Sequence, residues 1–577
     1  MLLDLSSLPD TGASFDVVVV GAGGAGLAAA LSAAIDGARV LLVEHTGHVG
    51  GSTALSGGTT WVPGTPEGAR VNPSDTIDRA AAYLDRCVGD RTPAALRRAL
   101  LEAGPQVVAH LQAESDLRFR PYARHPDYLS LIDGATVNGR ALEPEPFDGR
   151  VLGALFALVR PPIPEFTVLG GMMVDRIDIG HLLAMGRSWR SFRHAAGLLL
   201  RHAADRLRHP RGTRLVMGNA LVGRLLWSLS KRPNVSLAMH ASVDRFERGP
   251  EGITALTLVQ RGQRRRLQVR GGVVLASGGF NRHAQRRAEL LPGADPDWCP
   301  GAPGHTGQAH DLVQALGARY GEGGLSNAFW APVSLRRRAD GSTAVFPHFL
   351  MDRAKPGMLA VGRDGRRFVD ESTSYHLFAL AMQQPGSVDR TVPAWLVCDA
   401  DALRRYGLGM VRPGGRGLEP FLADGYLTRG DTLADLAATL GIDAAGLAAS
   451  VTQMNEAAET GDDASFGRGT GAYANHLGDA SAGGHNPNLG PLKTAPFYAV
   501  KLYPGDIGAA TGFVCDERAR VLGPDDAPLG GLYAVGNDMH SVMGGVYAGP
   551  GITLGPGLVF GGLAGRDAAA RARAAMA

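Results

Sequence analysis

FDVVVVGAGGAGLAAALSAAIDGARVLLVE, residues 15–44, is the stretch that decides the fold. It opens with an apolar run at 16–20 that suits a buried parallel strand, and an Ala/Leu-rich helix is expected over 24–36. Between them Gly21, Gly23 and Gly26 form a GxGxxG turn, which lets the backbone approach a pyrophosphate at the helix N-terminus. A second apolar run ends at Glu44, which can accept hydrogen bonds from ribose hydroxyls. Strand, turn, helix, strand and acid in this order predict a Rossmann-like dinucleotide-binding domain.

The composition is that of an ordinary globular protein. The 577 residues are enough for two or three domains, and the net charge of +3 is too small to indicate nucleic-acid binding. The four cysteines include no CxxC pair, so we expect neither a disulfide framework nor a metal site, and a reducing cytosol fits. Residues 1–16 lack a basic region followed by a long apolar run, so we expect no signal peptide and a cytoplasmic location.

Three more glycine-rich segments indicate which dinucleotide is bound. GHVGGSTALSGGTTWVPG (47–64) offers backbone N–H groups and small hydroxyls for a second phosphate and a ribityl chain. GGVVLASGGF (271–280) and GGLYAVGND (530–538) each resemble a strand that ends on glycine. Together these segments resemble the FAD-binding fold of the fumarate reductase and 3-ketosteroid dehydrogenase flavoproteins, in which the last strand returns the chain to the flavin. The resemblance covers most of the chain and implies FAD as the cofactor.

The resemblance also implies a discontinuous domain organisation. We expect an α/β chain with a Rossmann-like FAD-binding domain at 14–298 and 488–577, and an inserted α+β catalytic or capping domain at 299–487. Pro/Gly-rich segments at 291–307 and 483–497 would be the crossings, and helices capped by Asp431 and Asp443 are expected within 429–459. No second strand–GxGxxG–helix unit is found, so the reduced flavin is expected to pass electrons to an external acceptor, a quinone or another molecule.

The loop after the second strand bears on how FAD is held. Succinate dehydrogenases carry a covalently attached histidine in a similar loop, and Ser52 stands at that position here. We therefore expect non-covalent FAD. The candidate cofactor-binding residues are Gly21, Gly23, Gly24, Ala25, Gly26, Glu44, His45, Gly50, Gly51, Ser52, Thr53, Ser56, Gly57, Gly58, Val243, Ser277, Gly278, Gly536, Asn537, Gly551, Thr553 and Leu554.

The segment VYAGPGITLGPG (546–557) indicates a neutral substrate. Dicarboxylate-handling members of the broad family carry arginine and histidine in the corresponding segment, and this one has neither. Because a desolvated carboxylate needs a paired cation, a succinate or fumarate site is not expected. Tyr547, Gly551 and the YPGD segment (503–506) instead resemble the 3-ketosteroid Δ1-dehydrogenases.

Two further segments resemble stretches that carry catalytic tyrosines in those dehydrogenases. Residues 124–149 supply Tyr128, with Tyr122 as the alternative, and residues 362–378 supply Tyr375. The GAATGF and TGQAHD segments depart from the family pattern, and 150–230 matches nothing in it, so the exact substrate stays open.

The resemblance implies the 1,2-dehydrogenation of a small lipophilic ketone, a 3-ketosteroid or similar alicyclic ketone. Tyr547 and the Gly551 N–H would stabilise the charge that develops on the ketone oxygen. Tyr375, assisted by Tyr128, would take the proton, and hydride would pass to flavin N5. Gly551 is also expected to let the backbone approach the substrate closely. Two alternatives remain: a desaturase or ene-reductase acting at another ring position or on another neutral enone, and a non-catalytic flavin electron carrier.

Residues 187–211 are basic and apolar with helical spacing. One interpretation is a helix that contacts a membrane peripherally and admits lipophilic substrates. The other, which the sequence favours, is the solvated face of an ordinary packed helix.

Overall fold

Two sheets organise the computed structural model, which describes residues 1–9, 12–349 and 352–577. The first sheet has the strand order β18-β19-β11-β1-β2-β8, with β10 beside β11 and β9 beside β10. Strands β19, β11, β1, β2 and β8 are parallel to one another. The strands are β1 (Ser14–Val20), β2 (Val40–Glu44), β8 (Val235–Met239), β9 (Ala241–Gly249), β10 (Gly252–Gln260), β11 (Gln263–Leu275), β18 (Arg520–Leu522) and β19 (Pro528–Ala534).

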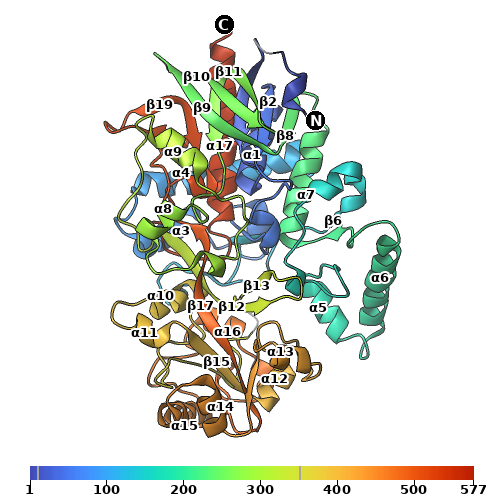
Figure 1. The fold of residues 1–577 in the computed structure, drawn as a ribbon, viewed down its shortest axis with the longest axis vertical. Helices are drawn as coiled ribbons and strands as arrows, with labels where there is room; N and C mark the ends of the chain where they lie inside the picture. Colours follow the sequence, from blue (N-terminus) through green and yellow to red (C-terminus); the bar gives the residue numbers. More distant parts are fainter. Residues whose placement is uncertain (10–11, 350–351) are drawn as a thin grey trace.

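The first two strands and the helix between them form as the sequence predicts. Helix α1 (Gly24–Ile35) follows β1 and lies beside the long C-terminal helix α17 (Leu554–Ala574), as Figure 1 shows. Glycines in α17 allow this contact, since a Cβ at Gly565 would lie 2.2 Å from the Ala29 carbonyl oxygen. The apolar residues of β1 are buried because helices and neighbouring strands cover them on both faces.

The second sheet is antiparallel and has the order β13-β12-β17-β15-β14, with β16 paired to β17. Its strands are β12 (Ala328–Arg337), β13 (Thr343–Pro347), β14 (Met358–Val361), β15 (Ala394–Asp399), β16 (Thr428–Gly430) and β17 (Phe497–Ala509). Because β17 pairs with β12 and β15, residues Phe497–Ala509 belong to this second sheet. The YPGD segment (503–506) lies within this strand.

Helices pack on both sheets and on one another. Asp443 caps α15 (Ala444–Thr460) as expected, but Thr432 and not Asp431 caps α14 (Leu433–Leu440), where it forms a capping box with Asp435. The others are α2 (Pro66–Ala69), α3 (Ile77–Val88), α4 (Ala94–Glu114), α5 (Arg176–Leu183), α6 (Trp189–Arg206), α7 (Met217–Ser230), α8 (Ala284–Leu290), α9 (Gln308–Gln314), α10 (Tyr375–Met382), α11 (Val388–Thr391), α12 (Ala400–Tyr406), α13 (Glu419–Ala423) and α16 (Ala472–Leu477).

Short strands complete the structure near the middle of the chain's long axis. They are β3 (Thr60–Trp61), β4 (Phe119–Pro121), β5 (Ala141–Pro144), β6 (Phe147–Asp148) and β7 (Arg214–Leu215). Beside them α5 and α6 project sideways from the body of the molecule (Figure 1).

Candidate active site

Residues of both sheets and their loops line one large cavity. It contains about 1660 Å³ of empty space, part of which is open to solvent. The β1–α1 turn, the 51–59 loop and the end of β11 supply one side, and Phe329, Pro347, Phe349, Tyr375 and Ile507 supply the other. The loops expected to bind the nucleotide and residues of the second sheet therefore face the same cavity.

The β1–α1 turn is shaped for a phosphate. Gly21 has φ +108°, and a Cβ there would lie 2.2 Å from the Ala276 carbonyl oxygen. A Cβ at Gly23 would instead meet open space, directly at the N-terminus of α1. The helix end thus faces the cavity with a favourable dipole, and the Gly24 N–H there donates to the Thr53 hydroxyl at 3.1 Å.

The second strand ends in a buried carboxylate on the same cavity. Glu44 lines the cavity and accepts hydrogen bonds from the Ala22 N–H (3.0 Å) and from the Thr46 N–H and hydroxyl (2.8 and 2.7 Å). These bonds fix the carboxylate where a ribose hydroxyl could reach its remaining lone pairs.

Most of the predicted cofactor-binding residues line this cavity, and four do not. Gly26 packs α1 onto β1, where a Cβ would lie 1.9 Å from the Gly21 carbonyl oxygen. Gly50 supports the turn by donating to the Ala22 carbonyl, His45 is exposed, and Val243 is buried in β9. Those that line the cavity are Gly21, Gly23, Gly24, Ala25, Glu44, Gly51, Ser52, Thr53, Ser56, Gly57, Gly58, Ser277, Gly278, Gly536, Asn537, Gly551, Thr553 and Leu554.

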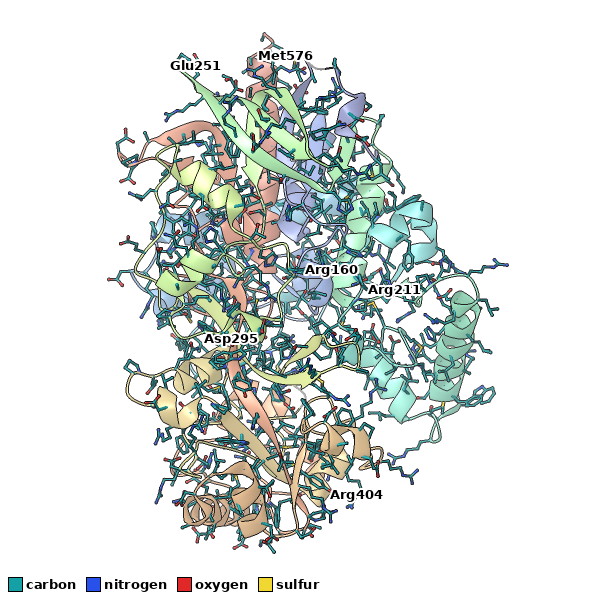
Figure 2. All side chains as sticks on the ribbon, viewed as in Figure 1. Arg160, Arg211, Glu251, Asp295, Arg404 and Met576 are labelled. Atoms are coloured by element: carbon teal, nitrogen blue, oxygen red, sulfur yellow. The ribbon has the colours of Figure 1, made fainter. Side chains whose placement is uncertain are left out.

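Two buried polar side chains at this end were not predicted from the sequence. Arg160 donates to the Thr46 hydroxyl at 3.1 Å, and its Nε has no hydrogen-bond partner among the described residues. Figure 2 shows Arg160 in the central region between the two sheets. His305 likewise lines the cavity with an unpaired Nδ1, and burial lowers its pKa to about 4. These unpaired donors and acceptors, with the open glycine turn, fit a phosphorylated dinucleotide.

Three tyrosines meet at the opposite end of the cavity. The hydroxyl oxygens of Tyr128 and Tyr375 lie 3.3 Å apart, with Tyr128 as the donor. The ring of Tyr547 stacks on Tyr128 at 5.5 Å and meets Tyr375 edge-on at 5.1 Å. All three were predicted as catalytic residues, and they come from segments more than 100 residues apart in the sequence. The arrangement places two hydroxyls in direct contact beside a third aromatic hydroxyl.

Backbone contacts hold the first and last of these tyrosines together. The Tyr128 N–H donates to the carbonyl of Ala548 at 2.9 Å, and the Tyr83 hydroxyl donates to the same carbonyl at 2.6 Å. The segment before Tyr128 is therefore fixed to the residue that follows Tyr547.

A neutral histidine fixes the position of Tyr375. Tyr375 opens α10, and the next residue, His376, accepts from the Trp330 N–H at Nδ1 (3.1 Å) and lies 3.0 Å from the Gly545 carbonyl through Nε2. One nitrogen accepts and the other donates, so this imidazole is neutral. Burial lowers its pKa to about 4, in agreement with that assignment. His376 thereby ties α10 to the segment that carries Tyr547.

The environment of the tyrosines favours their protonated forms. Burial raises the pKa of Tyr128 and of Tyr375 well above the ordinary value near 10, and it also raises the pKa of Tyr547. The hydroxyls of Tyr375 and Thr553 partly offset this effect at Tyr547. A phenolate at Tyr375 would therefore depend on hydrogen bonds donated by its neighbours.

Tyr122, the alternative to Tyr128, lies outside this cluster. Its hydroxyl pairs with the Thr59 hydroxyl at 3.1 Å, and its ring lies 4.9 Å below the Arg176 guanidinium. It does not line the cavity. Of Tyr122 and Tyr128, only Tyr128 contacts Tyr375 among the described residues.

Gly551 is confined by protein rather than left free for a substrate. It has φ +85°, and a Cβ would lie 2.3 Å from the Thr59 carbonyl oxygen, so the close approach is to β3 and its preceding loop. Its carbonyl accepts from the Trp61 N–H at 3.2 Å. Gly551 lines the cavity, and its own N–H has no acceptor among the described residues.

The acidic residue nearest to this C-terminal segment is occupied by structural contacts. Asp538 is fully buried and accepts from the N–H groups of Ser277 and Gly279 and from His310 Nε2. The His310 contact and these amides lower its pKa despite burial, and it does not line the cavity.

Comparison with known proteins agrees with this geometry. The model of the FAD binding domain family matches residues 16–554. The chain belongs to this family. It is 36% identical to 4-oxocyclohex-2-ene-1-carboxylate 5-dehydrogenase of Sinomonas cyclohexanicum, over 97% of this chain and 94% of that one. It is 34% identical to 3-oxosteroid 1-dehydrogenase of Mycolicibacterium smegmatis, over 98% of this chain and 99% of the relative.

A solved structure extends the likeness to three dimensions. It is 3-ketosteroid delta1-dehydrogenase from Sterolibacterium denitrificans in complex with 1,4-androstadiene-3,17-dione, with a TM-score of 0.89 and 32% identity, covering 97% of this chain and all of that one. The predicted FAD fold, the FAD cofactor and the assignment as an FAD-dependent oxidoreductase acting on CH–CH groups are confirmed. Among the described residues, no helix is long and apolar enough to cross a membrane.

In this FAD flavoprotein, residues that were not predicted as site residues also pack around Tyr128, Tyr375 and Tyr547. Tyr473, in α16, packs its ring 4.5 Å from Tyr128, and its buried hydroxyl has no partner among the described residues. Phe329 and Phe349 meet Tyr547 and Tyr375 edge-on. His125 lies three residues before Tyr128, and burial lowers its pKa to about 3. Only His125 carried a sequence signal, namely its place in the segment that supplied Tyr128.

Proposed function

We propose that this FAD-dependent oxidoreductase dehydrogenates a neutral ring ketone, a 3-ketosteroid or similar alicyclic ketone, across its 1,2 bond. The observation that carries the proposal is the meeting of Tyr128, Tyr375 and Tyr547 on one cavity with FAD-binding residues. The names of the relatives support the same class of reaction, since they are dehydrogenases of oxosteroids and of oxocyclohexenecarboxylates.

The residues divide the reaction between an oxygen site and a proton acceptor. The Tyr547 hydroxyl and the unpaired Gly551 N–H donate to the ketone oxygen, which gains negative charge as the neighbouring C–H bond breaks. The Tyr375 phenolate takes that proton, and the hydrogen bond from Tyr128 stabilises the phenolate before the transfer. Bound FAD supplies the hydride acceptor, and an external electron acceptor completes the turnover.

The charges on the cavity support a neutral substrate. The lining residues with a formal charge are Glu44 and Arg160, and both bond Thr46 at the nucleotide end. At the tyrosine end the lining carries no formal charge, and it is aromatic or apolar apart from the Thr553 hydroxyl and the buried neutral His125. A carboxylate would be desolvated there without a cation. This favours a ketosteroid over succinate, and over a ring ketone that carries a carboxylate.

Anaerobic mixing tests the proposal. The oxidised-flavin absorbance should bleach with 4-androstene-3,17-dione and persist with succinate, and 4-oxocyclohexanecarboxylate should react more slowly than the steroid. Mass spectrometry should find a product lacking two hydrogens, and NMR should place the new double bond at C1–C2. A double bond elsewhere would identify a desaturase of another ring position. Bleaching by succinate alone would refute the neutral site, and no bleaching by any ketone would favour an electron carrier.

A further inference from the structure

The helix that was ambiguous in the sequence turns an apolar stripe to solvent. Helix α6 buries Ser191, Ala195, His202 and Asp205 against the body of the protein. On its other side, Trp189 and Leu200 are 76% and 72% exposed, Phe192 is 45% exposed, and Leu207, which caps the helix, is 86% exposed. Residues 189, 192, 196, 200, 203 and 207 are Trp, Phe, Ala, Leu, Ala and Leu, at steps of three and four. We call these six residues the outer stripe.

This spacing makes the outer stripe one continuous face. Positions three and four apart lie above one another on a helix, and 18 residues at 1.5 Å each span about 27 Å. Trp189 and Phe192 stack on each other at 5.4 Å, and Leu183 and Met185 extend the apolar surface into the α5–α6 connection. Scattered exposed apolar residues need no explanation, whereas a contiguous stripe indicates an interaction surface.

The charges around the outer stripe have one sign. Between Asp178 and Asp205 the sequence contains no acidic residue. Arg187, Arg190 and Arg193 are exposed beside the aromatic end, and their side chains make no hydrogen bond or ion pair within the described parts of the chain. A surface that offers exposed Trp, Phe and Leu with unpaired arginines is complementary to apolar chains beneath negative headgroups.

The hairpin that bears the stripe is firmly attached. Arg214 bonds Asp178 at 2.7 Å, and His194 lies 2.9 Å from the same carboxylate. Figure 1 shows α6 at the outer side of the molecule, so the stripe can meet a flat surface. The segment just before α5 supplies Arg160 and Ile163 to the lining of the cavity.

We propose that the outer stripe and Arg187, Arg190 and Arg193 dock this protein on an anionic lipid bilayer. A second copy of the chain fits less well, because a two-fold contact through this face would oppose arginines to arginines. Docking would bring the cavity close to a phase that dissolves lipophilic ketones. That consequence rests on the proposed function, but lipid binding itself does not.

Vesicle sedimentation of the FAD-loaded protein tests the proposal. The parent should sediment with vesicles of phosphatidylcholine and phosphatidylglycerol at 7:3 and should bind pure phosphatidylcholine at least tenfold more weakly. About 1 kcal/mol for each arginine near the surface predicts a partition coefficient about 100-fold lower for R187Q/R190Q/R193Q. W189S/F192S should also lose at least about tenfold, because it removes the apolar anchors.

A matched control separates the stripe from general exposure. The side chain of Val388 is 44% exposed, about as much as that of Phe192, but Val388 lies on α11 and not on the outer stripe. The Val388→Ser variant should therefore bind vesicles like the parent. All variants should be bleached by 4-androstene-3,17-dione in solution like the parent, which tests the proposed function separately. No sedimentation of the parent would overturn the membrane proposal. So would sedimentation velocity showing a dimer that W189S/F192S converts to a monomer, with equal vesicle binding by parent and variant.

Discussion

Replacing Tyr128 with phenylalanine removes the hydrogen bond between its hydroxyl and the Tyr375 hydroxyl, and it keeps the ring. The bond to be lost is 3.3 Å long, whereas O–H···O bonds in proteins centre on about 2.7–2.8 Å. A hydrogen bond to a charged group contributes about 1.5–3 kcal/mol, and the long distance favours the lower end. The pKa of Tyr375 should therefore rise by about one unit in the variant.

Stopped-flow flavin reduction across pH measures this effect. Burial raises the pKa of Tyr375 above its ordinary value, so the phenolate is a minor species at working pH and increases as pH rises. The rate constant for reduction by 4-androstene-3,17-dione should accordingly rise about tenfold per pH unit. The Tyr128→Phe curve should be displaced to higher pH by about one unit, so that it is about tenfold slower at each pH.

Tyr122→Phe is the control for this experiment. It deletes a buried hydroxyl six residues away, but that hydroxyl pairs with Thr59 and not with Tyr375. Its rate should stay within about twofold of the parent, which would show that hydroxyl loss alone has little effect. If Tyr128→Phe matched the parent at every pH, or if Tyr122→Phe were the slower variant, the assignment of Tyr128 as the partner of the base would be refuted.

Four other changes test separate features of the site. Tyr547→Phe deletes a donor to the ketone oxygen and should slow flavin reduction about 100-fold, as seen by stopped flow; a rate near the parent's would exclude that role. Ser52 cannot form the histidyl link, so acid precipitation should leave FAD in the supernatant, and fluorescence retained in the pellet would contradict this. Gly551→Ala should lower the melting temperature as well as activity, because its Cβ would lie 2.3 Å from a carbonyl oxygen; an unchanged melting point would argue against that crowding. Burial lowers the pKa of His376 to about 4, below the value of about 6.5 in the unfolded chain. As the pH falls, the unfolded chain therefore takes up this proton before the folded protein does. The contribution of His376 to stability is complete above about pH 6.5 and declines towards pH 4, and urea midpoints of His376→Gln should fall less over that window than those of the parent.

The parts of the fold that the sequence predicted depend on local rules. The β1–α1–β2 unit could be predicted because strand, glycine turn, helix and strand follow one another in the sequence, and Gly26 packs against Gly21 within the same turn. The contact that confines Gly21, with Ala276, is not local and could not be read from the sequence. Residues 503–506 contain a Pro-Gly pair, which locally favours a turn, yet they form part of β17, whose partners lie about 100 and 170 residues earlier. Pairing across such separations overrides a local turn preference.

The candidate site shows the same division. Tyr128, Tyr375 and Tyr547 were located by motifs, but their contact and the orphaned hydroxyl of Tyr473 depend on the packing of α16 and α10. Arg160 was missed because it lies in a segment without a recognisable pattern, and its place on the cavity comes from its bond to Thr46, more than 100 residues away.

Strands β12 and β17 connect the second sheet to the cavity through one pair of opposite residues. Phe329 and Gly508 are partners in that pairing, and both line the cavity, as does Ile507. If the second sheet rotated with β12 and β17 still paired, Phe329, Ile507 and Gly508 would move together. Phe329 would then shift against the ring of Tyr547, which it meets edge-on. The second sheet and Tyr547 are thus linked through the ring of Phe329, so a substitution at Phe329 would affect the wall of the cavity and the packing of Tyr547 together.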